Sequence, residues 1–223
     1  KEGDCLVLND SRVIPARLIG TTEGLEHPVE FLLLKRHNVT DWETLVRPGR
    51  RLRPGAHVVF IPGVLEADVL EVLEGGNRLV RFQFRGVWEE VLSQAGQVPL
   101  PPYIHEKLED PERYQTVYSV HEGSAAAPTA GLHFTQELLD ELEKQGVRIV
   151  YVTLHVGLGT FRPVKEEDIL QHDMHSEFFI LNQTACDTLN EARIRGNKIV
   201  SCGTTSCRVL ESAPQKDHLI QPF

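Results

Sequence analysis

The chain has 223 residues, of which 41% are hydrophobic and 25% are charged, as in a globular protein with one large domain or two modest ones. It contains neither an apolar run near the roughly 18 residues of a membrane span nor a signal-peptide pattern, so we expect a cytoplasmic protein without membrane contact. Its 23 basic and 32 acidic residues give a net charge of -9, which argues against bulk, non-specific binding of nucleic acid.

The beginning of the chain predicts a strand that ends in a polar loop. Residues 5–8 are apolar, and Asn9, Asp10, Ser11 and Arg12 follow them directly. A buried strand followed by polar residues is typical of an α/β sheet.

The next region, residues 18–104, predicts a small β-barrel. Its β-forming runs are short and interrupted by Gly and Pro. These runs are residues 29–35, 42–47, 58–61, 66–73 and 78–84. The proline-rich residues 98–104 cannot continue a sheet, so we expect them to form a rigid connector.

A basic cluster lies inside the predicted barrel, between turn-forming residues. It consists of Arg47, Arg50, Arg51 and Arg53. Such clustering serves phosphate binding whatever the net charge of the protein, but a solvated hairpin would look the same in the sequence.

Helices and strands alternate in the second half of the chain. Thr135 is a suitable cap for a helix that stops at Gly146, and residues 147–156 are almost unbroken β-formers, as in a strand covered on both faces. A helix over residues 183–195 then precedes a strand over residues 198–202.

The alternation of helices and strands indicates an α/β fold, and the strand predicted at residues 5–8 suits the sheet of that fold. We therefore expect a discontinuous mixed α/β domain, residues 1–17 and 105–223, with the β-barrel of residues 18–104 inserted into it.

Four polar loops lie where α/β folds usually bind ligands, namely residues 9–17, 123–134, 154–161 and 203–206. The second is rich in small residues, which let a ligand approach the backbone, and contains His133. The third has two glycines after His155. The fourth opens a helix, whose first N–H groups can bind an anion.

Each loop also has a purely structural explanation. Gly157 and Gly159 lack the third glycine and the helix of a dinucleotide fingerprint, and residues 204–206 could simply cap a helix. His133 and His155 could be ordinary hydrogen-bonding histidines. His172 and His175 have no further metal ligands near them, and the four cysteines lack paired spacing, so we expect no metal and reduced thiols.

Taken in series, these segments closely resemble the S-adenosylmethionine:tRNA ribosyltransferase-isomerase family. The strings that carry the resemblance, in the family's order, are NDSRVIPARL (9–18), LVRPG (45–49), VPLPPYI (98–104), RYQTVY (113–118), APTAGLHF (127–134), TLHVGLGTFRPV (153–164), MHSE (174–177) and GTTS (203–206) with Arg208 and Glu211. The likeness covers nearly the whole chain and implies further family sequence beyond both of its ends.

The resemblance implies a two-domain protein, an α/β domain interrupted by a β-barrel, and a reaction. S-Adenosylmethionine, a consumed cosubstrate, gives its ribosyl unit to the 7-aminomethyl-7-deazaguanine at the wobble position of a tRNA. The products are epoxyqueuosine, adenine and methionine. The implied partner is the tRNA that carries this precursor base, and we expect a monomer.

Such chemistry needs a base beside the sulfonium, a negative group near that cation and an acid for the departing adenine. We expect His133 and His155 to transfer protons, with Asp10 or Glu177 near the sulfur. The expected cosubstrate-binding residues are Thr129, Gly131, Gly157, Gly159, Thr160, Thr204, Thr205 and Ser206. The expected tRNA-binding residues are Arg12, Arg17, Arg47, Arg50, Arg51 and Arg208. Of these, Arg12, Arg17 and Arg208 could contact either a phosphate or the methionine carboxylate.

Two other classes of protein remain open from the sequence. One is a different S-adenosylmethionine-dependent RNA-modifying enzyme, such as a methyltransferase, which would release adenosylhomocysteine and not adenine. The other is a non-catalytic RNA-binding protein that uses its barrel as an oligonucleotide-binding module.

Overall fold

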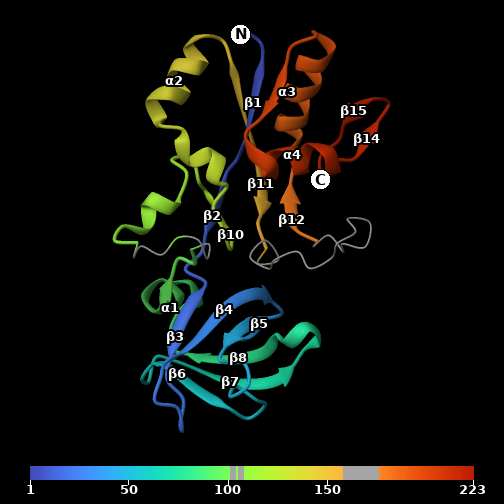
Figure 1. Ribbon diagram of the computed structural model, residues 1–223. Helices are drawn as coiled ribbons and strands as arrows, with labels where there is room; N and C mark the ends of the chain where they lie inside the picture. The colour runs from blue at the N-terminus through green and yellow to red at the C-terminus, as the bar shows by residue number, and fades with distance from the viewer. Residues whose placement is uncertain (101–103, 105–107, 158–175) are drawn as a thin grey trace. The chain divides into compact units, whose positions relative to one another are not determined.

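The computed structural model describes residues 1–100, 104, 108–157 and 176–223 (Figure 1). Contacts divide the chain into two compact units: unit 1 comprises Lys1–Ile14 and Pro101–Phe223, and unit 2 comprises Pro15–Leu100. The boundaries lie a few residues before those expected from the sequence. Arg17 in particular lies in unit 2, because it begins strand β3 (Arg17–Gly20), which pairs with other strands of that unit.

Unit 1 is built on a four-stranded sheet in the order β12-β11-β1-β13. The central strand β1 (Cys5–Asn9) runs parallel to β11 (Arg148–His155) and to β13 (Ile199–Ser201). Strand β12 (Phe178–Ile180) is antiparallel to β11. The three parallel strands confirm the strands expected from the sequence, whereas β12 was not predicted.

Helices cover the two faces of β1. Leu8 packs with Leu139 of α2 (Gln136–Lys144), while Val7, which points to the opposite face, packs with Leu189 of α3 (Gln183–Ile194). Figure 1 shows α2 on one side of β1 and α3 on the other. Helix α4 (Gly203–Ser212) joins the core of α3 through its buried Val209.

The helix ends follow the sequence signals. The Thr135 hydroxyl accepts a hydrogen bond from the Leu138 N–H at 3.3 Å, which confirms this residue as the cap of α2. After this helix the chain turns at Gly146 with φ +82, a left-handed conformation that favours glycine.

Shorter elements of unit 1 connect these layers. Strand β2 (Ser11–Val13) pairs in parallel with β10 (His121–Ser124), and β14 (Gln215–Lys216) pairs with β15 (Leu219–Ile220). Two 3-10 helices lie at Pro111–Tyr114 and Thr129–His133.

Unit 2 is a curled antiparallel sheet in the order β6-β7-β8-β5-β4-β3-β9. Besides β3, its strands are β4 (Val29–Arg36), β5 (Asp41–Arg47), β6 (His57–Ile61), β7 (Leu65–Val72), β8 (Arg78–Phe84) and β9 (Gly96–Gln97). The sheet curls enough for Thr21, after β3, to exchange two 2.9 Å backbone hydrogen bonds with Val59 of β6. The five strands expected from the sequence are confirmed.

Aromatic residues fill the core of unit 2. Phe31 meets Phe60 edge to face at 5.3 Å between ring centroids, and Phe82 lies 5.2 Å from Trp88. Trp88 begins helix α1 (Trp88–Ala95), which the sequence did not predict. The proline-rich connector lies in part outside the described residues, at positions 101–103.

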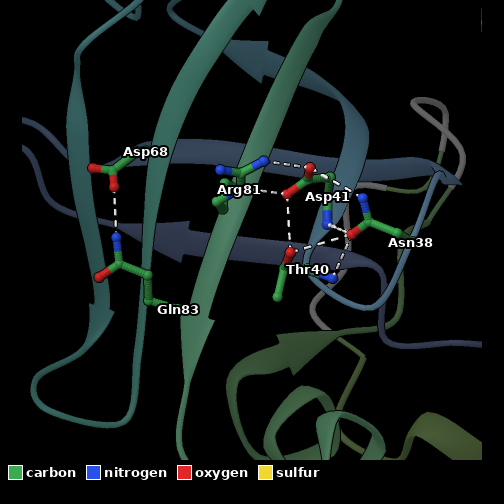
Figure 2. Close-up of polar contacts among 6 residues, drawn as sticks. All are labelled: Asn38, Thr40, Asp41, Asp68, Arg81 and Gln83. Atoms are coloured by element: carbon green, nitrogen blue, oxygen red, sulfur yellow. Dashed lines mark hydrogen bonds and ion pairs between the residues drawn. The ribbon is translucent and has the colours of Figure 1, made fainter.

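A polar network on unit 2 centres on Asp41 (Figure 2). Arg81 donates to both carboxylate oxygens of Asp41, through Nε at 2.7 Å and Nη2 at 2.8 Å. Asn38 Nδ2 and the Thr40 hydroxyl donate to the same carboxylate at 3.1 and 3.0 Å. These bonds, above all those from Arg81, hold the pKa of Asp41 well below its usual range.

This network predicts an acid-sensitive contribution to the stability of unit 2. Asp41→Asn should lower the free energy of unfolding at pH 7 by on the order of 2 kcal/mol, because charge-assisted hydrogen bonds are lost. A carboxyl whose pKa is depressed on folding contributes above its unfolded pKa, so the difference between mutant and wild type should shrink as the pH falls below about 4. Urea unfolding at several pH values would measure it. An equal difference at pH 7 and pH 3 would contradict this account.

Candidate active site

The side chain of Asn9 determines where the central strand leaves the sheet. Asn9 is 1% exposed, and its carboxamide donates to the Leu154 carbonyl at 3.0 Å and accepts the Leu154 N–H at 2.9 Å. It also accepts the Ser11 N–H at 3.2 Å. The Asn9 side chain thus takes the place of backbone groups in the hydrogen-bond ladder between β1 and β11. The backbone itself can therefore turn away from the sheet at the carboxyl end of β1.

Asp10 follows at this carboxyl edge and is almost completely buried. Its Oδ1 accepts a hydrogen bond from the Thr153 hydroxyl at 2.6 Å, and its Oδ2 lies 3.7 Å from Nε2 of His121. Burial raises the pKa of the Asp10 carboxyl, although the bond from Thr153 opposes the rise. A largely desolvated carboxylate is thereby held at the end of the sheet.

His155, the last residue of β11, lies at the same edge. Burial lowers the pKa of His155, and nearby His121 lowers it further, while Asp10 opposes them. Its ring stacks on Phe178 with centroids 5.7 Å apart, and its buried Nδ1 has no hydrogen-bond partner among the described residues. These surroundings favour a neutral imidazole, which can accept a proton.

Glu177 precedes β12, and its carboxylate accepts hydrogen bonds from two partners. Its Oε1 accepts the Gly157 N–H at 2.9 Å, and its Oε2 pairs with Nη1 of Arg208 at 2.5 Å. The Glu177 side chain is 6% exposed and that of Arg208 is 34% exposed. The pair links helix α4 to the segment that follows β11, and it compensates the charge of Glu177.

The start of α4 lies beside the 3-10 helix at Thr129–His133. A Cβ added to Gly203, whose φ is +77, would lie 3.0 Å from the Cβ of Ala130. Ser206, in the first turns of α4, is fully buried and its hydroxyl has no partner among the described residues. Cys202 occupies the N-cap without a side-chain hydrogen bond, so residues 204–206 do not act as the cap.

Gly131 is required by packing within the protein. A Cβ at this position would come within 2.1 Å of the Tyr118 hydroxyl and 2.9 Å of the Thr116 methyl group. By contrast, the nearest atom that a Cβ at Gly157 would meet among the described residues is Oε1 of Glu177, at 3.8 Å. The absence of a side chain at Gly131 is therefore explained without a ligand, whereas the described residues impose no such restriction at Gly157.

Several expected residues lie apart from the contacts around Asp10. His133, Thr129 and Thr204 are exposed, and the side chain of His133 forms no hydrogen bond or ion pair with any residue of the described segments. Arg12 donates to the Ser119 hydroxyl at 3.1 Å and forms an ion pair with Glu112. Gly159, Thr160, His172 and His175 lie outside the described residues.

The expected arginines of unit 2 fall into two groups. Arg17 is paired with Glu30 at 3.0 Å. The basic cluster is exposed and forms no ion pair with a described residue; its members are Arg47, Arg50, Arg51 and Arg53. Buried Arg78 supports this loop, because its guanidinium donates to the carbonyls of Gly49 at 2.5 Å and Leu52 at 2.7 Å.

Sequence reasoning missed Asn9, Thr153 and His121 as parts of the site. The signal for Thr153 was the alternation of β11, which places it and His155 on one face. His121 carried no motif of its own. It comes directly before the loop of small residues, and β10 brings it to Asp10, whose carbonyl accepts the His121 N–H at 3.2 Å.

The described residues contain neither a metal-binding cluster nor a membrane-spanning helix. No group of three or more His, Cys, Asp and Glu side chains there is arranged to hold a metal ion. In the same part of the chain, no helix combines the length and apolar character needed to cross a membrane.

The fold and the site define a mixed α/β protein with titratable groups gathered at the carboxyl ends of parallel strands, the usual place for ligand chemistry in such sheets. A family model described as "Queuosine biosynthesis protein" matches residues 1–222. The chain belongs to this family, which confirms the resemblance found in the sequence.

Similar proteins carry names that agree with the family. The chain is 58% identical over 221 residues to the S-adenosylmethionine:tRNA ribosyltransferase-isomerase of Acetivibrio thermocellus, covering 99% of this chain and 65% of that protein. It is 56% identical over 222 residues to the protein of the same name from Caldanaerobacter subterraneus subsp. tengcongensis, covering 100% of this chain and 65% of the relative. The chain thus spans somewhat less than two thirds of their length.

Among solved structures, the chain is similar to the S-adenosylmethionine tRNA ribosyltransferase of Thermotoga maritima. The identity is 33%, the TM-score is 0.34, and the match covers 95% of this chain and 56% of the other.

The two glycines provide a test of the packing described here. Gly131→Ala should destabilise unit 1 by about 1–3 kcal/mol, because the added methyl group overlaps the Tyr118 hydroxyl. Gly157→Ala, the matched control, should unfold at nearly the wild-type temperature because its Cβ would approach no described atom closer than Oε1 of Glu177, at 3.8 Å. Thermal unfolding of both variants measures the difference. If both variants lost the same amount of thermal stability, the close approach of Tyr118 to Gly131 would not restrict the side chain at this position.

Proposed function

We propose that the protein transfers and isomerises the ribosyl unit of S-adenosylmethionine onto the 7-aminomethyl-7-deazaguanine wobble base of tRNA. The products would be epoxyqueuosine, adenine and methionine. Family membership supports the reaction class, and the observation that carries it to a site is the buried Asp10 carboxylate, which accepts a hydrogen bond from Thr153 and acts electrostatically on His155 at the same edge of the sheet. We place the reaction in the cytoplasm, where its tRNA substrate is found.

The site offers a base for the proposed chemistry. His155 would remove the proton from the carbon next to the sulfonium, because its buried surroundings favour the neutral imidazole. Asp10 is the better of the two carboxylates for the positive sulfur, since Arg208 already compensates Glu177. Glu177 would instead hold the Gly157 N–H beside the ligand.

We also propose residues that bind S-adenosylmethionine in unit 1 and tRNA in unit 2. Gly157, whose N–H is held by Glu177, and the first turn of α4, with Thr204, Thr205 and the Ser206 hydroxyl that has no partner among the described residues, would bind S-adenosylmethionine. Unit 2 would be a barrel domain inserted into the α/β domain, and its exposed basic cluster would bind tRNA phosphates.

Product analysis tests the proposed reaction. The full-length protein is incubated with S-adenosylmethionine and tRNA that carries the precursor base, and nucleosides and small molecules are then identified by mass. Free adenine, free methionine and epoxyqueuosine are expected. Adenosylhomocysteine would indicate methyl transfer, and tRNA binding without turnover would indicate a binding protein.

The pH dependence tests the role of His155. A base must be neutral, so activity should fall as the pH drops through its pKa, and because that pKa is lowered the fall should lie below about pH 6.5. Asp10→Asn should move this limb to still lower pH, since the Asp10 charge raises the pKa of His155. His155→Gln should lower kcat by about 10²–10⁴ and remove the limb. An unchanged acid limb in His155→Gln would exclude this residue as the base.

The basic cluster yields a separate prediction. Replacing Arg50 and Arg51 together by alanine should weaken tRNA binding and reduce the slope of log affinity against log salt by about 0.7–0.9 per lost phosphate contact. The control is Arg36→Ala, because this exposed arginine is already paired with Glu89 at 3.3 Å. S-Adenosylmethionine affinity should be unchanged in both variants. A tRNA salt slope equal to that of the wild type would identify the cluster as a solvated loop.

A further inference from the structure

His121 faces the buried carboxylate of Asp10 from strand β10. Its Nε2 lies 3.7 Å from Asp10 Oδ2, and its side chain is 55% exposed whereas that of Asp10 is 12% exposed. The Asp10 carbonyl accepts the backbone N–H of His121, which ties the start of β10 to the end of β1. One imidazole is therefore held between the buried carboxylate and solvent.

The same strand passes directly against His155. A Cβ added to Gly123, whose φ is +144, would lie 2.8 Å from Nε2 of His155, so the backbone approaches the ring more closely than a side chain would allow. His121 and His155 both act electrostatically on Asp10. The site thus holds one carboxylate with two histidines, His155 half-buried with its Nδ1 enclosed and His121 open to solvent.

We propose that His121 is the acid of the reaction, giving its proton to the departing adenine while His155 removes the proton beside the sulfonium. This inference rests on the proposed function. As the bond between the ribosyl carbon and the adenine nitrogen breaks, its electron pair stays on adenine, which takes up the His121 proton. The electron pair of the C–H bond that His155 opens stays on the ribosyl unit and replaces the pair lost with adenine. Asp10 would orient the His121 ring, and solvent would return the proton afterwards.

The environments of the two histidines divide the roles. His155 is enclosed by Phe178 and β10, which suits a neutral base. His121 reaches water, which an acid that must be reprotonated in each turnover requires. His133, the second histidine favoured by the sequence, has no carboxylate partner in the described part of the chain.

Chemical rescue tests the assignment. In the full-length protein, His121→Ala should slow adenine release by about 10²–10⁴, with KM for S-adenosylmethionine unchanged. Added imidazole should restore part of the rate, because the half-exposed side chain leaves a space open to solvent. His121→Gln should show the same loss of kcat with a wild-type unfolding temperature, which separates the proton transfer from folding.

The matched control is His57→Ala, which removes another histidine paired with a carboxylate, Asp68 at 2.8 Å, in unit 2. It should release adenine at the wild-type rate, with no response to imidazole. Wild-type turnover in His121→Ala would overturn the assignment, as would a loss that imidazole leaves unchanged or a rescue seen only in His133→Ala. If the wild type releases no adenine, the proposed function itself fails, and that result is distinct from a failure of His121.

The His121→Gln variant also tests whether His121 and His155 interact electrostatically. Among the described residues, the titratable groups that act on His155 are Asp10, at the end of β1, and His121, on β10. Because His121 depresses the pKa of His155, His121→Gln should move the acid limb of the residual activity to higher pH. A limb that stays in place would show that the two rings are not coupled through this site.

Discussion

The unit 1 site depends on the carboxamide of Asn9. This buried side chain satisfies both the N–H and the carbonyl of Leu154, two groups that would otherwise lose their partners where β1 ends. An unsatisfied buried polar group costs about 1–3 kcal/mol, so the chain can leave the sheet here only because the side chain replaces backbone. Asp10 is then turned toward Thr153 and His121, and the polar site begins at that residue.

The groups around Asp10 come from segments that are distant in the sequence. Thr153 and His155 arrive on β11, His121 arrives on β10, and Asp10 itself follows β1. The parallel register of β1 with β11 places Asn9 opposite Val152, which brings Thr153 within hydrogen-bond distance of Asp10. The two-sided core around β1 fixes this register, so the chemistry depends on the packing of the whole unit.

Much of unit 1 could be predicted because its long elements have strong local signals. Apolar runs marked β1 and β11, and Thr135 with Gly146 marked the ends of α2. Strand β10 could not be found in this way, since His-Glu-Gly-Ser contains no strong β-former and its conformation is set by pairing with β2. Helix α1 was missed because it is short and lies in a region otherwise made of strands.

The candidate site was predictable to the extent that its residues followed strong strands. Asp10 follows β1 and His155 ends β11, and in the structure the two residues interact electrostatically. The structure gives Gly131 a packing role that the loop composition could not reveal, and it pairs Arg12 with Glu112. His121 could not be predicted as a site residue from the sequence, because only the fold brings it to Asp10.

The central claim is that S-adenosylmethionine binds at the carboxyl edge of the unit 1 sheet, against Asp10 and its two histidines. The most direct test follows the imidazole NMR signals of the full-length protein during titration with S-adenosylmethionine. Saturable shifts of the His155 and His121 signals are predicted, while the His57 signal in unit 2 stays in place. Saturation of the protein without any change at His155 and His121, or with a change confined to His57, would contradict the account.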